Sequence, residues 1–479
     1  MTAAAAIEET SALARALLTD LGRPADAPPH RIAIAHRDPI FPTALRAGEA
    51  AAAVLAAQAT AAADLWCLRG GAPQQIDVDV RAAAASLVSF ALQRATASVP
   101  LRQPPPTVAF FATADGQWVH LHGGFPSLHA GTLALLDCAD DADAIAGAVC
   151  AWEASALEDA LAERGLCGAR LRSAAEWRMH PQGVALQAVP LVTLTRIGDA
   201  PREALPGPPA TVAGARPLSG VRVLDLTRVL AGPTCARTLA EHGADVLHVR
   251  SPALPSIEPF VVDTNVGKHS CHLDLDAPED ARRLRALVRD ADVFAQGYRP
   301  GALARRGCSP AELAGLRPGI IVAALSCYGH DGPWSERPGW EQLAQTVSGM
   351  AHEHGATPPA VIPAAITDYT TGYLGALGVL CALARRAEVG GSWLVQVSLT
   401  RTAMWLLSLP RVEGDRPPAG VDRAALAPWW ITMDSAWGVL RRLGPIARMS
   451  ATPPRWDLPP ARLGSHPAAW QPRDSGAST

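Results

Sequence analysis

Apolar and polar positions along the chain predict short strands and helices, and the clearest set lies near the middle. Residues 220–226 form a β-branched run of the kind that is buried on both faces of a parallel sheet. The turn 230–234 leads into a predicted helix over 235–242, and a second apolar run covers 244–250. Strand, turn, helix and strand in this order predict a doubly wound α/β domain, which binds its ligands beyond the carboxyl ends of the strands.

Further apolar runs extend this pattern toward the C-terminus. They predict buried strands at 271–275, 291–296, 320–325 and 393–399, with an amphipathic helix over 278–290. The predicted fold class is therefore α/β, with a Rossmann-like parallel sheet.

The part of the chain before residue 200 contains both new and repeated elements. Residues 108–122 alternate on either side of an Asp-Gly turn and predict a hairpin, which we assign to a smaller α+β domain. An alanine-rich helix over 44–68 and a strand from residue 75 repeat the pattern that ends in the strand 393–399. We interpret this self-similarity at one long offset as a duplication.

Composition and charge predict a soluble cytoplasmic protein. With 479 residues, 49% of them hydrophobic, the chain can bury a large core, and its net charge of −3 gives no reason to expect nucleic acid or an anionic membrane as partner. Nine cysteines without a CxxC pair favour a reducing compartment. Residues 1–22 read as an amphipathic helix, and residues 50–63 are too short and too weakly hydrophobic for a membrane span.

Several sequence blocks resemble, in the same order, those of the class III CoA-transferases, a family that includes formyl-CoA and carnitine CoA-transferases and the α-methylacyl-CoA racemases. The blocks lie between residues 217 and 405 and read VRVLDLTRVLAGP, GADVLHVR, NVGKHS, ADVFAQGYRPG, SCYGHDGP and GWEQLAQ. The resemblance implies a CoA thioester as substrate, with no permanently bound cofactor and no metal. It also implies small-molecule acyl-CoA and carboxylic acid partners and a homodimer.

The order of the blocks departs from the usual one, because segments of the family's small domain precede the central unit. We divide the chain into an N-terminal helix and linker (1–40), a partial transferase unit with the small-domain hairpin (41–205), a CoA-binding and catalytic unit (217–405) and a Pro- and Trp-rich arm (410–479). The unit 41–205 either completes the fold or is a degenerate companion. The presence of all the missing pieces favours completion.

The segment 366–372 resembles the family's loop that carries a catalytic aspartate, which assigns that role to Asp368. Free amides at a helix start favour a carboxylate and can stabilise an oxyanion formed on it. The resemblance implies covalent catalysis through an aspartyl-CoA thioester; a plain helix cap is the alternative. Glu341 matches a transferase-type acid, and Trp340 lies beside it as a substrate contact. Glu49 is the counterpart of Asp368 in the repeat, and we read it as an ordinary helix residue.

The family binds CoA after the first strand and around the second and fourth, and arginine suits phosphate because its fork donates two hydrogen bonds. The resemblance therefore assigns CoA binding to the following residues: Val229, Leu230, Arg250, Ser251, Lys268, Tyr298, Arg299 and Arg305.

Other functions remain open from the sequence. A racemase of the same superfamily is disfavoured because Trp340 stands where that branch has a histidine base. A non-catalytic acyl-CoA binder is possible. An NADP-dependent oxidoreductase would suit Arg250, but the turn 230–234 lacks the GxGxxG pattern.

Overall fold

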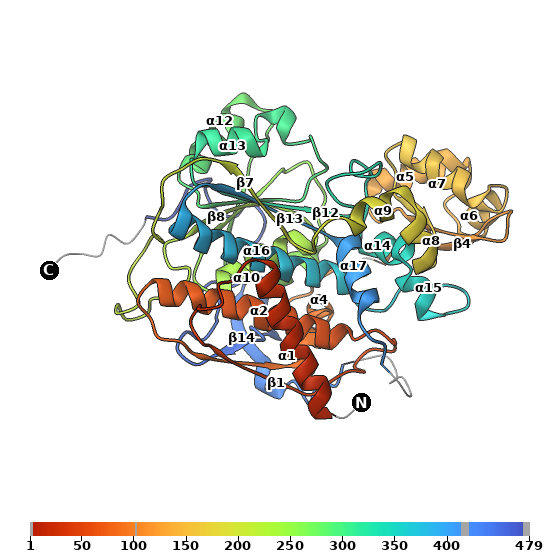
Figure 1. Ribbon diagram of the computed structural model, residues 1–479. Helices are drawn as coiled ribbons and strands as arrows, with labels where there is room; N and C mark the ends of the chain where they lie inside the picture. Colours follow the sequence, from red (N-terminus) through yellow and green to blue (C-terminus); the bar gives the residue numbers. More distant parts are fainter. Residues whose placement is uncertain (1–2, 101–102, 413–420, 473–479) are drawn as a thin grey trace.

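The computed structural model describes residues 3–100, 103–412 and 421–472, and its centre is a seven-stranded sheet (Figure 1). The strand order is β10-β9-β8-β11-β12-β13-β7, in which β7 alone runs antiparallel to its neighbour. Counted from β8, the six parallel strands have the order 3-2-1-4-5-6, which is that of a doubly wound sheet and confirms the predicted fold class. The strands are β7 (Thr193–Gly198), β8 (Arg222–Leu226), β9 (Asp245–Arg250), β10 (Lys268–His272), β11 (Val293–Gln296), β12 (Ile321–Ser326) and β13 (Ser392–Ser398).

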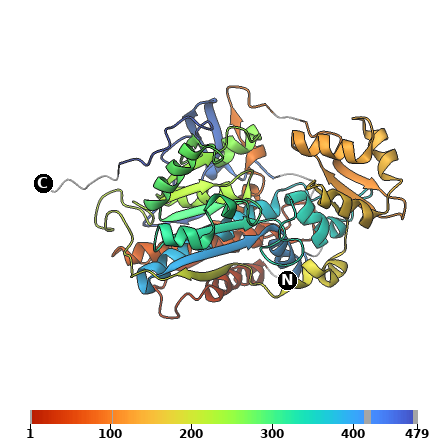
Figure 2. The same ribbon diagram turned by 90° about the horizontal axis from the view of Figure 1, so that it is seen from above.

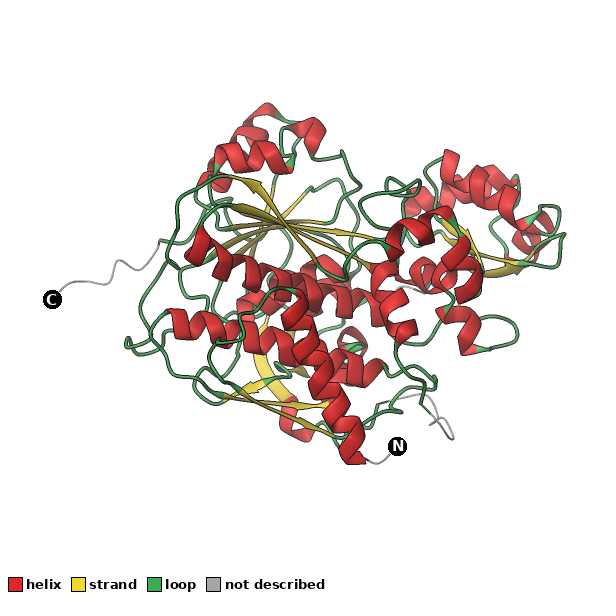
Figure 3. Cartoon of the chain, viewed as in Figure 1, coloured by secondary structure: helices red, strands yellow, loops and turns green. Residues whose placement is uncertain are grey.

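Helices cover both faces of the sheet (Figure 3). One face is covered by α12 (Pro278–Arg289) and α13 (Pro310–Leu316), the other by α10 (Ala231–Glu241) and α16 (Ile366–Val389) (Figure 1). The helix α10 begins four residues earlier than the sequence predicts, since Leu230 is its N-cap. Shorter helices complete this part: α4 (Ser89–Leu92), α11 (Glu258–Thr264), α14 (Glu341–Ser348), α15 (Met350–His354) and α17 (Leu399–Ser408).

A further layer is formed by the N-terminal helix pair. The alanine-rich α2 (Ala47–Leu68) packs against α16, and α1 (Ala3–Asp20) packs against α2. At 22 residues with a mean hydropathy of 1.4, α2 has the length and composition of a membrane span, which corrects the prediction from residues 50–63. In the structure, 83% of its most apolar window is buried inside the protein. Alanine side chains here serve close helix packing.

The duplicated elements appear in the same order in both halves. The series α2, β2 (Gln75–Asp79) and α3 (Val80–Ser86) corresponds to α16, β13 and α17. The strand β2 belongs to a separate sheet, between β1 (Arg31–Ala35) and β16 (Arg448–Met449).

The smaller α+β unit lies at one end of the molecule (Figure 2). Its antiparallel sheet confirms the predicted hairpin and consists of β4 (Val108–Ala112), β5 (Trp118–His122) and β6 (Gly168–Arg170). Its helices are α5 (Pro126–Leu136), α6 (Ala142–Val149), α7 (Ala154–Glu163), α8 (Ala174–Met179) and α9 (Pro181–Gln187). The strand β7 then leads the chain back to the edge of the large sheet.

The C-terminal arm is fastened to the core by tryptophan side chains. The strands β14 (Trp430–Ser435) and β15 (Gly438–Leu443) pair with each other and with β3 (Arg94–Ala95). The indole N–H groups of Trp437, Trp456 and Trp470 donate hydrogen bonds to Glu258 Oε1, Arg237 O and Leu287 O at 2.8, 3.1 and 3.0 Å. Residues 413–420 and 473–479 of the predicted arm lie outside the described residues.

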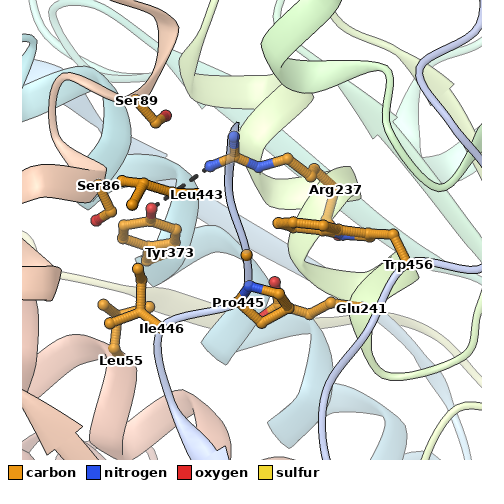
Figure 4. Close-up of a pocket in the computed structure, with 11 residues that line it drawn as sticks. Leu55, Ser86, Ser89, Arg237, Glu241, Tyr373, Leu443, Pro445, Ile446 and Trp456 are labelled. Atoms are coloured by element: carbon orange, nitrogen blue, oxygen red, sulfur yellow. Dashed lines mark hydrogen bonds between the residues drawn. The ribbon is translucent and has the colours of Figure 1, made fainter. Parts of the chain in front are cut away.

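A buried ionic cluster joins the arm to the core. The carboxylate of Asp263 accepts hydrogen bonds from Arg237 at 2.8 Å, Arg442 at 3.1 Å and the Tyr369 hydroxyl at 2.8 Å. Figure 4 shows Arg237 beside Trp456, with its bond to the Tyr373 hydroxyl across a small cavity. The two guanidinium groups lower the pKa of Asp263 below its usual range, despite the opposing effect of burial.

Asp263→Asn should lower the free energy of unfolding by about 3–5 kcal/mol at neutral pH, because two buried arginines lose their counter-charge. Since the pKa of Asp263 is lower in the folded state, its stabilising contribution is present above the unfolded pKa of 3.8 and is lost as the pH falls through the lower folded pKa. Urea unfolding across acidic pH should therefore show a smaller pH dependence in the variant. Equal slopes for both proteins would contradict this role.

Candidate active site

The side chain of Asp368 lies in the first turn of α16, and a carboxylate from another helix caps this turn. The N-cap residue Ala365 offers no side-chain cap. Glu341, the first residue of α14, accepts hydrogen bonds from the Asp368 amide at 2.5 Å, and from the Thr367 amide at 3.1 Å and hydroxyl at 2.5 Å. Its other contact is Gln345 Nε2 at 2.7 Å. Glu341 therefore fixes the position of the Asp368 backbone.

The carboxylate of Asp368 is itself free of cationic partners. In residues 3–100, 103–412 and 421–472, no side chain lies in an ion pair with it and none donates a hydrogen bond to it. Only 7% of the residue is exposed, and burial followed by the nearby charge of Glu341 raises its pKa well above the usual value. Burial also raises the pKa of Glu341. A weakly solvated carboxylate without a counter-ion is a better nucleophile than one held in an ion pair.

Two residues that the sequence did not predict, Cys327 and Phe125, belong to the surroundings of Asp368 and Trp340. Cys327 follows β12, and the charge of Asp368 adds to burial in raising its thiol pKa. Its Sγ contacts the Trp340 carbonyl at 3.7 Å. The Trp340 ring in turn packs on Phe125 of the small unit, with ring centroids 5.1 Å apart, and on His122 at 6.0 Å. The small unit thus supplies aromatic side chains next to the site.

A cavity lies at the carboxyl ends of β8 and β9, where the fold predicts a nucleotide. It is lined by side chains that include Phe125, Arg228, Val229, His248 and Arg250. Phe125 therefore borders both this cavity and Trp340, and the Arg228 guanidinium lies 5.5 Å from the centre of its ring.

Val229 has a strained backbone in the loop between β8 and α10. Its φ of +68° lies in the left-handed region, which β-branched residues avoid. Such strain persists where surrounding structure enforces it, and it clusters at ligand sites. Val229 lines the cavity, and its contact with CoA stays a prediction.

The other predicted CoA residues are divided between the cavity and the surface. Arg250 is 4% exposed, and its Nη2 donates to Leu254 O at 3.3 Å and Pro255 O at 3.4 Å. Burial lowers its pKa to about 10, and it lies near Tyr298. Leu230 is buried as the N-cap of α10, whereas Ser251 lies just beyond β9 and caps a turn by accepting from the Ala253 amide at 3.4 Å.

Two predicted arginines lie outside this cavity. Arg299 and Arg305 are exposed near the end of β11. Arg299 Nη2 donates to Gly165 O of the small unit at 3.3 Å. Either arginine would reach a phosphate of a ligand that extends from the cavity to the end of β11.

The structure places Lys268 differently from the prediction of a phosphate contact. Its amine is 1% exposed and donates to Asp225 Oδ2 and Pro233 O, both at 2.8 Å. The lysine thus joins β8, β10 and the start of α10 from beneath the loop. Sequence alone could not distinguish this buried pair from a phosphate ligand, because the partner Asp225 is 43 positions away.

Comparison with known proteins identifies similar chains. The model of CoA-transferase family III matches residues 218–420. An acyl-CoA transferase of Gibberella moniliformis is 32% identical over 416 residues, covering 75% of this chain and 73% of the relative. The acetyl-coenzyme A transferase nodX of Hypoxylon pulicicidum is 36% identical over 317 residues, covering 62% of this chain and 54% of that protein. A solved structure of a CAIB/BAIF family protein from Brucella suis is 26% identical, covers 47% of this chain and 65% of its own, and has a TM-score of 0.39. The chain thus spans about three quarters of the first relative and about half of the second.

Lys268→Met should lower the free energy of unfolding by about 3–5 kcal/mol, because the Asp225 carboxylate stays buried without its counter-ion. Adding Asp225→Leu should recover much of the loss, since both charges are then gone. Urea unfolding followed by tryptophan fluorescence measures both variants. A double variant as unstable as the single one would show that this ion pair does not hold the loop.

Proposed function

Since the chain belongs to CoA-transferase family III, we propose that it moves CoA from an acyl-CoA donor to a carboxylic acid acceptor, with Asp368 as the covalent nucleophile. The observation that supports this role most directly is the uncompensated carboxylate of Asp368 at the amino end of α16. A carboxylate that served only as a cap would bind the amides itself, whereas here Glu341 binds them.

The reaction needs only bond exchange at carbonyl carbons. A carboxylate oxygen of Asp368 attacks the thioester carbon; a C–O bond forms, the C–S bond breaks and CoA thiolate leaves an acyl-aspartyl anhydride. The thiolate then attacks the aspartyl carbonyl, forming a C–S bond and releasing the donor acid as a carboxylate. The acceptor carboxylate attacks this aspartyl-CoA thioester, and the same two steps in reverse give the new acyl-CoA and free Asp368. No net proton transfer is required.

The surroundings of Asp368 suit a carboxylate nucleophile. Weak solvation makes the ionised carboxylate reactive. Because only 7% of Asp368 is exposed, substrate entry requires the covering side chains to move. Phe125 lines the cavity and packs on Trp340, so displacement of these two rings would admit the acyl end of the substrate.

The distal part of CoA would bind at the cavity beyond β8 and β9, which at about 20 Å³ must first widen by movement of its lining side chains. Arg228, Val229 and Arg250 line it. Binding energy gained there can position a thioester against a weak nucleophile. The acyl donor and acceptor would be selected at the boundary between the two units, where Phe125 and Trp340 meet.

Asp368→Ala should abolish exchange of CoA between acyl-CoA and acid, lowering kcat at least about 1000-fold because the covalent route is lost. Intact-mass analysis with acyl-CoA should show a CoA adduct on the wild type and none on the variant. Asp331→Ala, a change at an exposed carboxylate of the neighbouring loop, is the matched control. Exchange at the wild-type rate by Asp368→Ala would exclude this nucleophile.

Glu341→Gln should move the acidic limb of the pH profile of kcat/KM to lower pH. Asp368 must be ionised to attack, and loss of the neighbouring negative charge lowers its pKa. The rate should also fall, since the amide nitrogen of Gln cannot accept from the donors that Glu341 binds. Glu336→Gln, at an exposed position, should leave the profile unchanged. An unshifted limb in Glu341→Gln would mean that its charge does not act on Asp368.

A further inference from the structure

We infer that the start of α2 is a second copy of the nucleophile site, silenced by an ion pair between Arg46 and Glu49. This inference rests on the proposed function of Asp368. It assigns one working nucleophile to each chain, although the chain contains two copies of the local architecture.

The two helix starts have the same backbone geometry. The N-cap of α16, Ala365, has φ −83° and ψ 59°, and the N-cap of α2, Arg46, has φ −80° and ψ 57°. These angles are unusual for an N-cap, which normally lies in the extended region. The offset that pairs Asp368 with Glu49 in the repeat also pairs Ser398 with Asp79. Each of these two side chains caps the helix that follows its strand. The repeat thus extends from the sequence to the backbone geometry.

Each helix start is also capped by a carboxylate from an earlier segment. Glu341 accepts from the amides of Thr367 and Asp368 at the start of α16. Asp38 accepts from the Glu49 amide at 2.8 Å at the start of α2.

The neighbouring residue also lies against the capping carboxylate. A Cβ added to Gly48 would lie 2.9 Å from Asp38 Oδ1, and the Thr367 amide donates to Glu341 Oε1 at 3.1 Å. The alignment that pairs Asp368 with Glu49 pairs Thr367 with Gly48. Asp38 therefore occupies the place of Glu341 at the start of α2, and the amide bond to the residue at the nucleophile position is common to both helix starts.

The copies differ in what surrounds the nucleophile position. Ala365 leaves the space before Asp368 empty of charge, whereas Arg46 occupies the same position before Glu49. Arg46 Nε donates to Glu49 Oε2, and its Nη1 donates to Glu9 Oε2 at 2.7 Å. Both residues of the pair are buried, at 7% and 4% exposure. One carboxylate oxygen of Glu49, Oε2, is thereby held in an ion pair, which lowers the nucleophilicity of this carboxylate.

The copy at α2 also lacks the elements that form the cavity beside Asp368. The unit β8, α10 and β9 leads up to α16, whereas α1 and β1 stand before α2. The contribution of the copy at α2 is structural. Its helix α2 packs on α16, and the chain that follows it delivers His122 and Phe125 to Trp340 beside the working site. Both halves of the site therefore come from a single chain, and a second chain is not needed to complete it.

The number and position of covalent adducts test this inference. The wild-type chain is incubated with acyl-CoA, trapped with hydroxylamine, and analysed by intact mass and peptide mapping. One modification per chain is expected, on the peptide that contains Asp368 and not on the peptide that contains Glu49. Modification of Glu49, in the wild type or in Asp368→Ala, would overturn the inference while leaving a transferase. No modification at any position would instead count against the proposed function.

Transplanting the blocking residue gives an independent test. Ala365→Arg should place a guanidinium beside Asp368, as Arg46 is placed beside Glu49, and should lower adduct formation at least about 100-fold. Ala365→Gln adds bulk without charge and should retain more activity than Ala365→Arg. Circular dichroism and the melting temperature check that both variants fold. Wild-type adduct formation by Ala365→Arg would overturn the inference, and, if that variant does not fold, adduct mapping on the wild type still decides it.

Discussion

The close approach of α16 to its neighbours is the constraint on which the site depends. A Cβ at Gly372 would lie 2.5 Å from Ala231 O of α10, and one at Gly378 would lie 2.4 Å from Val395 Cγ1 of β13. Neither separation is sterically possible, so only glycine permits this packing. Because α16 and α10 then begin side by side, Asp368 lies near the loop that forms the nucleotide cavity. These two glycines therefore set the position of Asp368 relative to this loop.

The helix α2 packs against α16, and this contact joins the N-terminal half of the chain to the half that contains Asp368. Alanine residues let α2 approach closely, and burial of the whole helix fixes the N-terminal half against the catalytic half. The small unit follows α3 in the chain, and β7 then returns antiparallel to β13 before β8 begins the sheet. An antiparallel edge strand lets the chain enter the sheet without a crossover helix. The unusual order of the blocks is thus compatible with an ordinary doubly wound sheet.

Periodicity and resemblance predicted much of the sheet and the position of Asp368, because strands and capped helix starts are local features of the sequence. The same reasoning placed Lys268 at a phosphate, since its partner Asp225 lies on another strand and the pairing arises only from the fold. Phe125 and Cys327 were missed for the same reason: Phe125 reaches Trp340 from the small unit, and Cys327 lies 41 positions before Asp368, so both contacts arise only from the fold. The left-handed backbone of Val229 leaves no mark on its residue type, which argues against such a conformation. Glu49 was read as an ordinary helix residue, and the partners that give it a meaning, Arg46 and Asp38, become evident only in three dimensions.

The two copies illustrate how stability and reactivity compete for the same carboxylate. A buried acid is expensive unless it is paired, and an arginine neighbour removes this cost by holding the acid as an ion pair. The carboxylate of Glu49 is held in such an ion pair with Arg46. Asp368 has no such partner, and burial with the Glu341 charge keeps its pKa raised. Under the proposed function, the carboxylate of Asp368 is the one available to a substrate carbonyl, and the helix start of α2 differs from it both by Arg46 and by the elements that precede the helix.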